Sequence, residues 1–108
     1  MAEQLSEEEL AMFDLLTRPD LTLSDKEQEQ IKKVVPDLLA TLKREKLVLD
    51  WRKKQQARAE VRLAVELALD TGLPTSYTNE MYQRTCEEVF QHIYDSYFGP
   101  GQSVYTAA

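Results

Sequence analysis

Apolar residues recur at helical spacing in four stretches of the chain. Within each stretch they follow one another at intervals of three or four residues, which places them on one face of a helix with ~3.6 residues per turn. No stretch shows the alternation of apolar and polar residues that is typical of a strand. The pattern therefore predicts an all-α fold, a compact helical bundle of about four main helices.

The first two helices are predicted from the residues at their starts. Ser6 and Ser24 are each followed three residues later by a glutamate, so the serine and the glutamate can each bond a free backbone amide at the helix start. We expect the first helix over residues 7–17. The second helix carries apolar residues as far as Leu42 but contains Pro36, which predicts either a kink or two helices that meet at the proline.

The third stretch predicts a central helix that begins at Trp51 and ends before Gly72. We expect Asp50 to cap it and Trp51 to wedge between helices, because the indole has the largest apolar surface in the chain. Residues 47–49 are apolar without helical spacing and predict a tight extended corner. Two apolar stripes predict that the helix packs on two sides. They consist of Ala57, Val61, Ala64, Val65 and Ala68, and of Ala59, Leu63 and Leu67.

The fourth stretch predicts a last helix whose apolar face is rich in aromatic residues. Thr78 or Ser76 can cap its start, and residues 99–101 end it with two glycines around a proline. The face consists of Tyr82, Cys86, Val89, Phe90, Ile93, Tyr94 and Tyr97. At 108 residues the chain has the size of one domain. We predict a single helical domain over 1–108 whose ends, 1–5 and 100–108, are flexible unless they dock.

Charge is distributed unevenly along the chain, whose net charge is −6. Residues 43–62 hold eight basic and three acidic side chains, a local net of +5, whereas both flanking segments are acidic. Lys54, Arg58 and Arg62 lie four residues apart between the two apolar stripes, so we expect the exposed strip of the central helix to be mostly basic. The candidate partner-binding residues are Lys53, Lys54, Arg58 and Arg62. A solvated face, a protein-docking surface and a phosphate contact all fit such residues.

The sequence contains no motif for catalysis or cofactor binding. It lacks the glycine-rich loops that hold nucleotide phosphates, and its single histidine, His92, has no second ligand at metal-binding spacing. We therefore expect no catalytic, cofactor-binding or metal site and no small-molecule substrate. A lone cysteine, Cys86, fits a reducing compartment, and no apolar run is long enough for a membrane span. Both observations favour a cytoplasmic protein without a membrane partner.

Residues 43–98 resemble the C-terminal helical domain of the R subunit of type I restriction enzymes, the subunit that combines motor and endonuclease. The resemblance is carried by LLATLKREKLVLDWRKKQQARAEVRLAVELALD over residues 38–70, by the turn at 74–77 and by YQRTCEEVFQHIYDSY over residues 82–97. Its most distinctive parts are the tryptophan that follows LVLD and the VFQH sequence that precedes YDSY.

The resemblance implies a specific place in a larger enzyme. Such R subunits contain a nuclease domain, two helicase-type motor domains that move duplex DNA with ATP and Mg²⁺, and a helical C-terminal part that holds the subunit on the methyltransferase core of M and S subunits. This chain would be that docking segment, a C-terminal fragment and no enzyme by itself. Its partners would be the M and S subunits and the other R domains, with DNA contacted indirectly or weakly. ATP and Mg²⁺ would belong to the parent subunit, an ATP-dependent site-specific deoxyribonuclease.

Two other functions stay open beside docking. One is a DNA-contacting module whose basic helix follows the duplex, and the other is a cover for an apolar face of the motor. If the domain docks on a protein, the four basic residues would form the polar contact surface. Exposed aromatic side chains at Tyr77, Tyr97 and Phe98 would then add anchors. Pro36 in the second helix is not expected from the resemblance.

Overall fold

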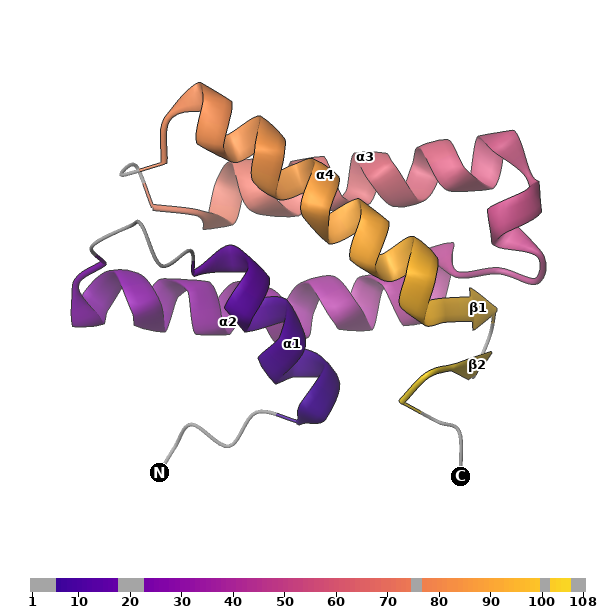
Figure 1. Cartoon of the computed structure of the whole chain (residues 1–108), viewed down its shortest axis with the longest axis horizontal. Helices are drawn as coiled ribbons and strands as arrows, with labels where there is room; N and C mark the ends of the chain where they lie inside the picture. Colours follow the sequence, from indigo (N-terminus) through magenta and orange to yellow (C-terminus); the bar gives the residue numbers. More distant parts are fainter. Residues whose placement is uncertain (1–5, 18–22, 75–76, 100–101, 106–108) are drawn as a thin grey trace.

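The computed structural model describes residues 6–17, 23–74, 77–99 and 102–105, and these form a bundle of four α-helices (Figure 1). The helices are α1 (Glu7–Leu16), α2 (Asp25–Thr41), α3 (Gln55–Gly72) and α4 (Asn79–Ser96). A π-helical turn (Leu42–Lys46) and a 3₁₀ turn (Trp51–Lys53) lie between α2 and α3, and two short strands, β1 (Tyr97–Gly99) and β2 (Gln102–Ser103), follow α4. The predicted helical bundle is confirmed.

The four helices form two layers. In Figure 1, α2 and α3 run side by side in opposite directions, α4 lies across them and α1 lies across α2. The main contacts join α1 to α2, α2 to α3, α3 to α4 and α4 back to α1, so each helix has two principal neighbours. The buried core between them takes side chains from all four helices and from the turns that link α2 to α3.

The predicted helix starts are confirmed where the structure describes them. Ser6 Oγ accepts from the backbone N–H of Glu9 at 3.2 Å, and Ser24 Oγ accepts from that of Glu27 at 3.1 Å. In both capping boxes the glutamate carboxylate accepts from the serine N–H at 2.9 Å. Each box thus satisfies two amides that the helix itself leaves unpaired. The hydroxyl of Thr78 caps α4, and the alternative cap, residue 76, lies outside the described residues.

Pro36 lies inside one continuous helix. α2 runs from Asp25 to Thr41 without interruption, so the alternative of two helices that meet at the proline is wrong. The residues on either side explain why the helix continues, because Ile31, Val35, Leu38 and Leu39 are all buried in the core. Tertiary packing of this apolar face offsets the local cost of the proline, which is ~3 kcal/mol in an isolated helix.

Trp51 is fully buried in the core and confirms the predicted wedge. Its side chain is fully buried, and its indole Nε1–H donates to the carbonyl oxygen of Tyr97 at 3.1 Å. The ring lies edge-on to Phe90 and Tyr94 of α4, with centroid distances of 6.3 and 5.9 Å. The hydrogen bond and the ring contacts both join Trp51 to the α4–β1 segment. This residue therefore fixes the corner before α3 against α4 and β1.

The corner before α3 differs from the prediction. Asp50 adopts a left-handed backbone conformation with φ 59°, and its side chain makes no capping hydrogen bond. Trp51 opens a short 3₁₀ turn, and α3 begins only at Gln55, after an extended Lys54. The expected helix start at Trp51 with an Asp50 cap is therefore wrong. The chain must bend sharply to place the indole in the core, and aspartate tolerates positive φ better than most residues.

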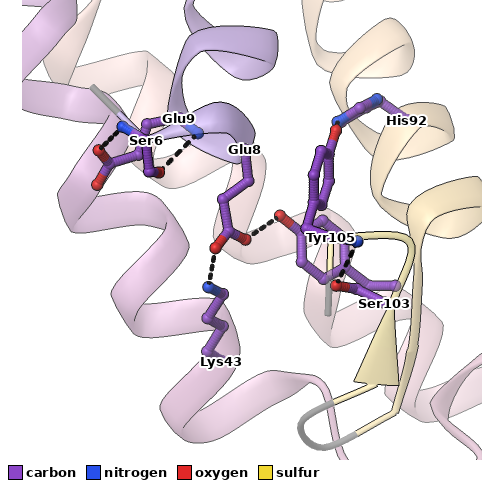
Figure 2. A network of polar contacts seen from close by, with 8 residues as sticks. Ser6, Glu8, Glu9, Lys43, His92, Ser103 and Tyr105 are labelled. Atoms are coloured by element: carbon purple, nitrogen blue, oxygen red, sulfur yellow. Dashed lines mark hydrogen bonds and ion pairs between the residues drawn. The ribbon is translucent and has the colours of Figure 1, made fainter. Parts of the chain in front are cut away.

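A small hairpin after α4 was not predicted. β1 and β2 pair antiparallel with Tyr97 opposite Ser103, and the Val104 N–H donates to the carbonyl oxygen of Ser96 at 2.9 Å. The Tyr105 hydroxyl lies 3.2 Å from His92 Nε2 (Figure 2). Residues 102–105 are thus docked on α4, the exception that the prediction of flexible ends allowed. The rest of these ends, 1–5, 100–101 and 106–108, lies outside the described residues.

Candidate docking surface

Only one of the two apolar stripes on α3 is buried. Val61 and Val65 of the first stripe are fully buried, as is Leu69 in the next turn. In the second stripe, Leu63 is 54% and Leu67 58% exposed. α3 contacts both α2 and α4, so the prediction that it packs on two sides is confirmed, but the second stripe stays exposed. Its two leucines would need a further neighbour, which the described residues do not supply.

The exposed leucines line a groove between α2 and α3, which we call the α2–α3 groove. Its volume is about 440 Å³. The apolar lining comes from Leu38 on α2 and from four residues of α3, and the polar lining comes from both helices and the π-helical turn. The lining residues are Asp37, Leu38, Thr41, Lys46, Glu60, Leu63, Ala64, Leu67, Ala68 and Thr71. Such concave apolar surfaces with a few polar groups are typical of binding sites.

Two further hollows extend this groove along α3. One shares Asp37, Ala68 and Thr71 with it and reaches Gly72 at the C-terminal end of α3. The other shares Lys46 and Glu60 and continues past Val48 to Lys54 at the N-terminal end. Since α3 has 18 residues, the hollowed surface follows a helix roughly 27 Å long.

Two of the four predicted partner-binding residues are engaged inside the domain. The half-buried Arg58 donates from Nη1 to the carbonyl oxygen of Arg52 at 2.6 Å, which ties α3 to the 3₁₀ turn. Arg62 pairs with Glu66 at 3.4 Å and with Glu87 at 3.7 Å, which ties α3 to α4. The charge of Arg62 is therefore partly neutralised, and the guanidinium of Arg58 is held against the 3₁₀ turn.

The other two predicted residues are free to meet a partner. Lys53 and Lys54 are exposed at the start of α3, and within the part of the chain that the structure describes neither has an ion-pair partner. The structure brings Arg58 and Lys54 to the same end of α3 but directs Arg58 into the 3₁₀ turn. The exposed face of α3 carries Leu63 and Leu67, so the expectation of a mostly basic strip is wrong.

Of the three aromatic residues expected as anchors, only Phe98 is exposed. Tyr97 is 2% exposed, and its hydroxyl donates to Glu8, so it belongs to the core. Tyr77 is half-buried and its hydroxyl donates to the carbonyl oxygen of Leu16. Phe98 is 39% exposed and lies against the guanidinium of Arg52, 4.9 Å from its ring centroid. The expectation for Tyr77 and Tyr97 is therefore wrong, because both tie helices together.

A polar network joins the start of α1 to the π-helical turn after α2 and to β1 after α4. The Glu8 carboxylate accepts from Lys43 Nζ at 2.6 Å (Figure 2). It also accepts from the Tyr97 hydroxyl at 2.7 Å. Burial by itself would raise the pKa of Glu8, but the hydrogen bonds from Lys43 and Tyr97 and the charge of Lys43 outweigh it and lower that pKa below 4.5. Glu8 is thus held ionised in the folded protein.

This network predicts a pH-dependent contribution of Glu8 to stability. Because the folded-state pKa lies below the unfolded value, the contribution is complete above pH 4.5 and is lost as the pH falls through the folded pKa. Glu8→Gln should lower the free energy of unfolding by about 1 kcal/mol at pH 7, and the difference from wild type should shrink below pH 4.5. Urea unfolding at several pH values measures this difference.

Glu7→Gln is the matched control, since the neighbouring glutamate is exposed and lies outside this network. We expect it to change the free energy of unfolding by at most a few tenths of a kcal/mol, roughly the effect of one charge at a helix start. A Glu8→Gln effect that is equal at pH 7 and pH 3.5 would show that the charge of Glu8 does not stabilise the fold.

The two residues with potential reaction chemistry make structural contacts. Burial lowers the pKa of His92, and its Nε2 lies 3.2 Å from the hydroxyl of Tyr105. Burial also raises the pKa of Cys86, whose side chain is 4% exposed.

In the described ranges no three His, Cys, Asp or Glu side chains gather where they could hold a metal ion. No helix among those ranges is long and apolar enough to cross a membrane.

Comparison with known proteins adds one match. A family described as "Type I restriction enzyme HindI endonuclease subunit-like, C-terminal" has a model that matches residues 1–97 of the chain. No curated protein and no solved structure gives a significant match. The family match includes all four helices, both turns between α2 and α3, and the α2–α3 groove.

Proposed function

The chain belongs to the family of C-terminal domains of type I restriction enzyme HindI endonuclease subunit-like proteins, and from this premise we propose that it is a non-catalytic assembly domain. It docks the ATP-dependent DNA translocase and endonuclease onto the methyltransferase core of M and S subunits. In this proposal ATP and Mg²⁺ are bound by other domains of the parent subunit. The domain acts in the cytoplasm, where the restriction enzyme meets DNA.

One observation carries the proposal: α3 presents Leu63 and Leu67 to solvent above an apolar groove. Each leucine is more than half exposed, and the two lie one helical turn apart beside the buried Leu38. Clustered large apolar side chains on a soluble surface mark protein-interaction sites. A DNA duplex offers mainly phosphate and sugar contacts, which would leave the two leucine side chains exposed to water. The groove therefore favours a protein partner.

A DNA-contacting module is the second candidate, and the exposed Lys53 and Lys54 favour it. Two lysines that neutralise two phosphates would give log K a slope of roughly −2 against log salt. Arg58 and Arg62 add little to such a surface, because Arg58 bonds the 3₁₀ turn and Arg62 pairs with two glutamates. The net charge of −6 further weakens attraction to a duplex. The geometry therefore supports protein docking better than DNA tracking.

Competition in the assembled enzyme tests this function. The full 108-residue chain is added in excess to the cognate type I enzyme, and both ATP-dependent cleavage and methylation of DNA are followed. If the chain occupies the docking site, cleavage falls, methylation continues, and additional endonuclease subunit relieves the inhibition. Inhibition that only additional duplex relieves would favour DNA contact. Unchanged cleavage at saturating chain would contradict the docking function.

A further inference from the structure

We propose that the α2–α3 groove receives an amphipathic α-helix of the partner protein, whose acidic end lies over Lys54. The inference rests on the proposed assembly function and deepens it by naming the contact surface and the chemistry of its occupant. It is carried by three features of the groove: its helical walls, the spacing of its exposed leucines and the unequal charge of its two ends.

The walls of the groove favour a helix over an extended segment. Both walls are α-helices, whose backbone N–H and C=O groups are already paired within each helix, so the groove offers no free strand edge. An extended peptide in this groove would leave its own backbone groups without partners in an apolar environment. A helix satisfies its backbone internally and buries one face, which is the usual way for a peptide to fill such a groove.

The apolar side chains of the groove have the spacing of a helix–helix contact. Leu63 and Leu67 are at positions i and i+4 on α3 and form a ridge, while Leu38 and Thr41 line the α2 side. A third helix can lay its own ridge between α2 and α3, because such ridges pack into grooves at interaxial distances of ~8–10 Å. Along α3 the occupant would present apolar residues at i, i+4, i+7 and i+11.

The N-terminal end of α3 carries the charge that sets the direction of the occupant. Lys46 is paired with Glu60 at 3.6 Å, so their charges offset each other. Lys54 lines the same end of the groove, is exposed and has no ion-pair partner among the residues described. The first turn of α3 also contains no acidic side chain. The net charge here is positive, and a carboxylate of the occupant would complement it.

At the opposite end of the groove the charges of the lining residues already cancel. Lys33 and Asp37 line it with one charge of each sign. The side chain of Gln30 donates to the carbonyl oxygen of Gly72 at 2.9 Å, which satisfies a backbone acceptor at the C-terminal end of α3. Because only the Lys54 end has uncompensated charge, the acidic end of the occupant is expected there. A second copy of this chain is disfavoured as occupant, since each copy has a net charge of −6.

Binding of the full chain to the cognate methyltransferase complex tests the groove. Leu63→Glu with Leu67→Glu should weaken this binding by at least about a hundredfold, because both carboxylates would be desolvated in an apolar contact. Leu10→Glu is the matched control, since Leu10 is 48% exposed but lies on α1, away from the groove. The control should bind within about twofold of wild type, and all variants should keep the helical circular dichroism of wild type, as expected for exposed positions.

Charge reversal tests the direction of the occupant. Lys54→Glu should weaken binding by about tenfold at physiological salt, as for a charge pair at an interface. Lys26→Glu makes the same change of net charge at an exposed position of the first turn of α2, and it should leave the affinity unchanged. Hydrogen–deuterium exchange on the complex should protect a helical segment of the partner with an acidic end.

The outcomes separate the groove from the assembly function. Wild-type binding that survives both leucine changes would overturn the groove inference and leave the assembly function standing. Absence of wild-type binding to the methyltransferase would overturn both. If hydrogen–deuterium exchange protected a β-strand of the partner instead of a helix, the inference of a helical occupant would be overturned. A concentration-dependent dimer of the chain, lost on Leu67→Glu, would assign the groove to a second copy instead.

Discussion

Trp51→Ala is expected to lower the free energy of unfolding by about 3–5 kcal/mol, the usual range for removing a large buried aromatic side chain. Trp51 is fully buried against Phe90 and Tyr94, and its loss also leaves the carbonyl oxygen of Tyr97 without its hydrogen bond. Since small domains are stable by only about 5–15 kcal/mol, this loss is a large share of the total, and the urea midpoint should fall clearly below that of wild type. Urea unfolding followed by far-ultraviolet circular dichroism measures the change.

Two control variants separate the contributions of the indole. Trp51→Phe keeps part of the ring packing but removes the Nε1–H donor, so we expect a smaller loss of about 2–3 kcal/mol. Phe98→Ala removes an aromatic side chain that is 39% exposed, and it should cost about 1 kcal/mol or less. If Trp51→Ala and Phe98→Ala proved equally stable, the buried indole of Trp51 would not be a main contributor to the stability of the core.

Gly72→Ala is expected to destabilise the domain by about 1–3 kcal/mol through overpacking. A Cβ at position 72 would overlap Val34 Cγ2 on α2 and lie 3.4 Å from Val34 Cβ. Val34 is half-buried and branched at Cβ, so it has few alternative rotamers with which to make room. The glycine therefore permits the close approach of α2 to the C-terminal end of α3.

A double-mutant cycle with Val34→Ala tests this account of Gly72. Combined with Gly72→Ala, the smaller side chain should recover more than about half of the loss, which appears as a coupling energy of roughly 1 kcal/mol. Strictly additive effects would show that Gly72 and Val34 are independent. Stabilisation by Gly72→Ala alone would contradict the contact, since alanine is otherwise preferred over glycine in helices by ~0.5–1 kcal/mol.

Local signals predicted most of the fold. The capping boxes at Ser6 and Ser24 and the periodicity of apolar residues are properties of neighbouring residues, and the structure confirms them. The start of α3 could not be read in this way, because Trp51 is drawn into the core by partners about 40 residues later in the chain. The strands after α4 have only three and two residues, too few to show alternation.

The candidate site was harder to predict, because exposure depends on neighbours that a sequence does not show. Val61 and Leu63 belong to two similar stripes, yet Val61 is fully buried and Leu63 is 54% exposed. Arg58 and Arg62 share the charge and spacing of Lys54, but a backbone carbonyl and two glutamates engage them inside the domain. Exposed Leu63 and Leu67 were visible in the sequence only as a second apolar stripe, which is usually a sign of burial.

Titration of the full chain into the cognate methyltransferase complex of M and S subunits tests the docking function most directly. It should be run at low and at physiological salt, beside a parallel titration with a plain duplex of ~30 base pairs. We expect saturable binding to the methyltransferase complex of M and S subunits in the absence of DNA. Its salt dependence should be weak because the contact is mainly apolar. Binding to the duplex with steep salt dependence, and none to the methyltransferase, would contradict it.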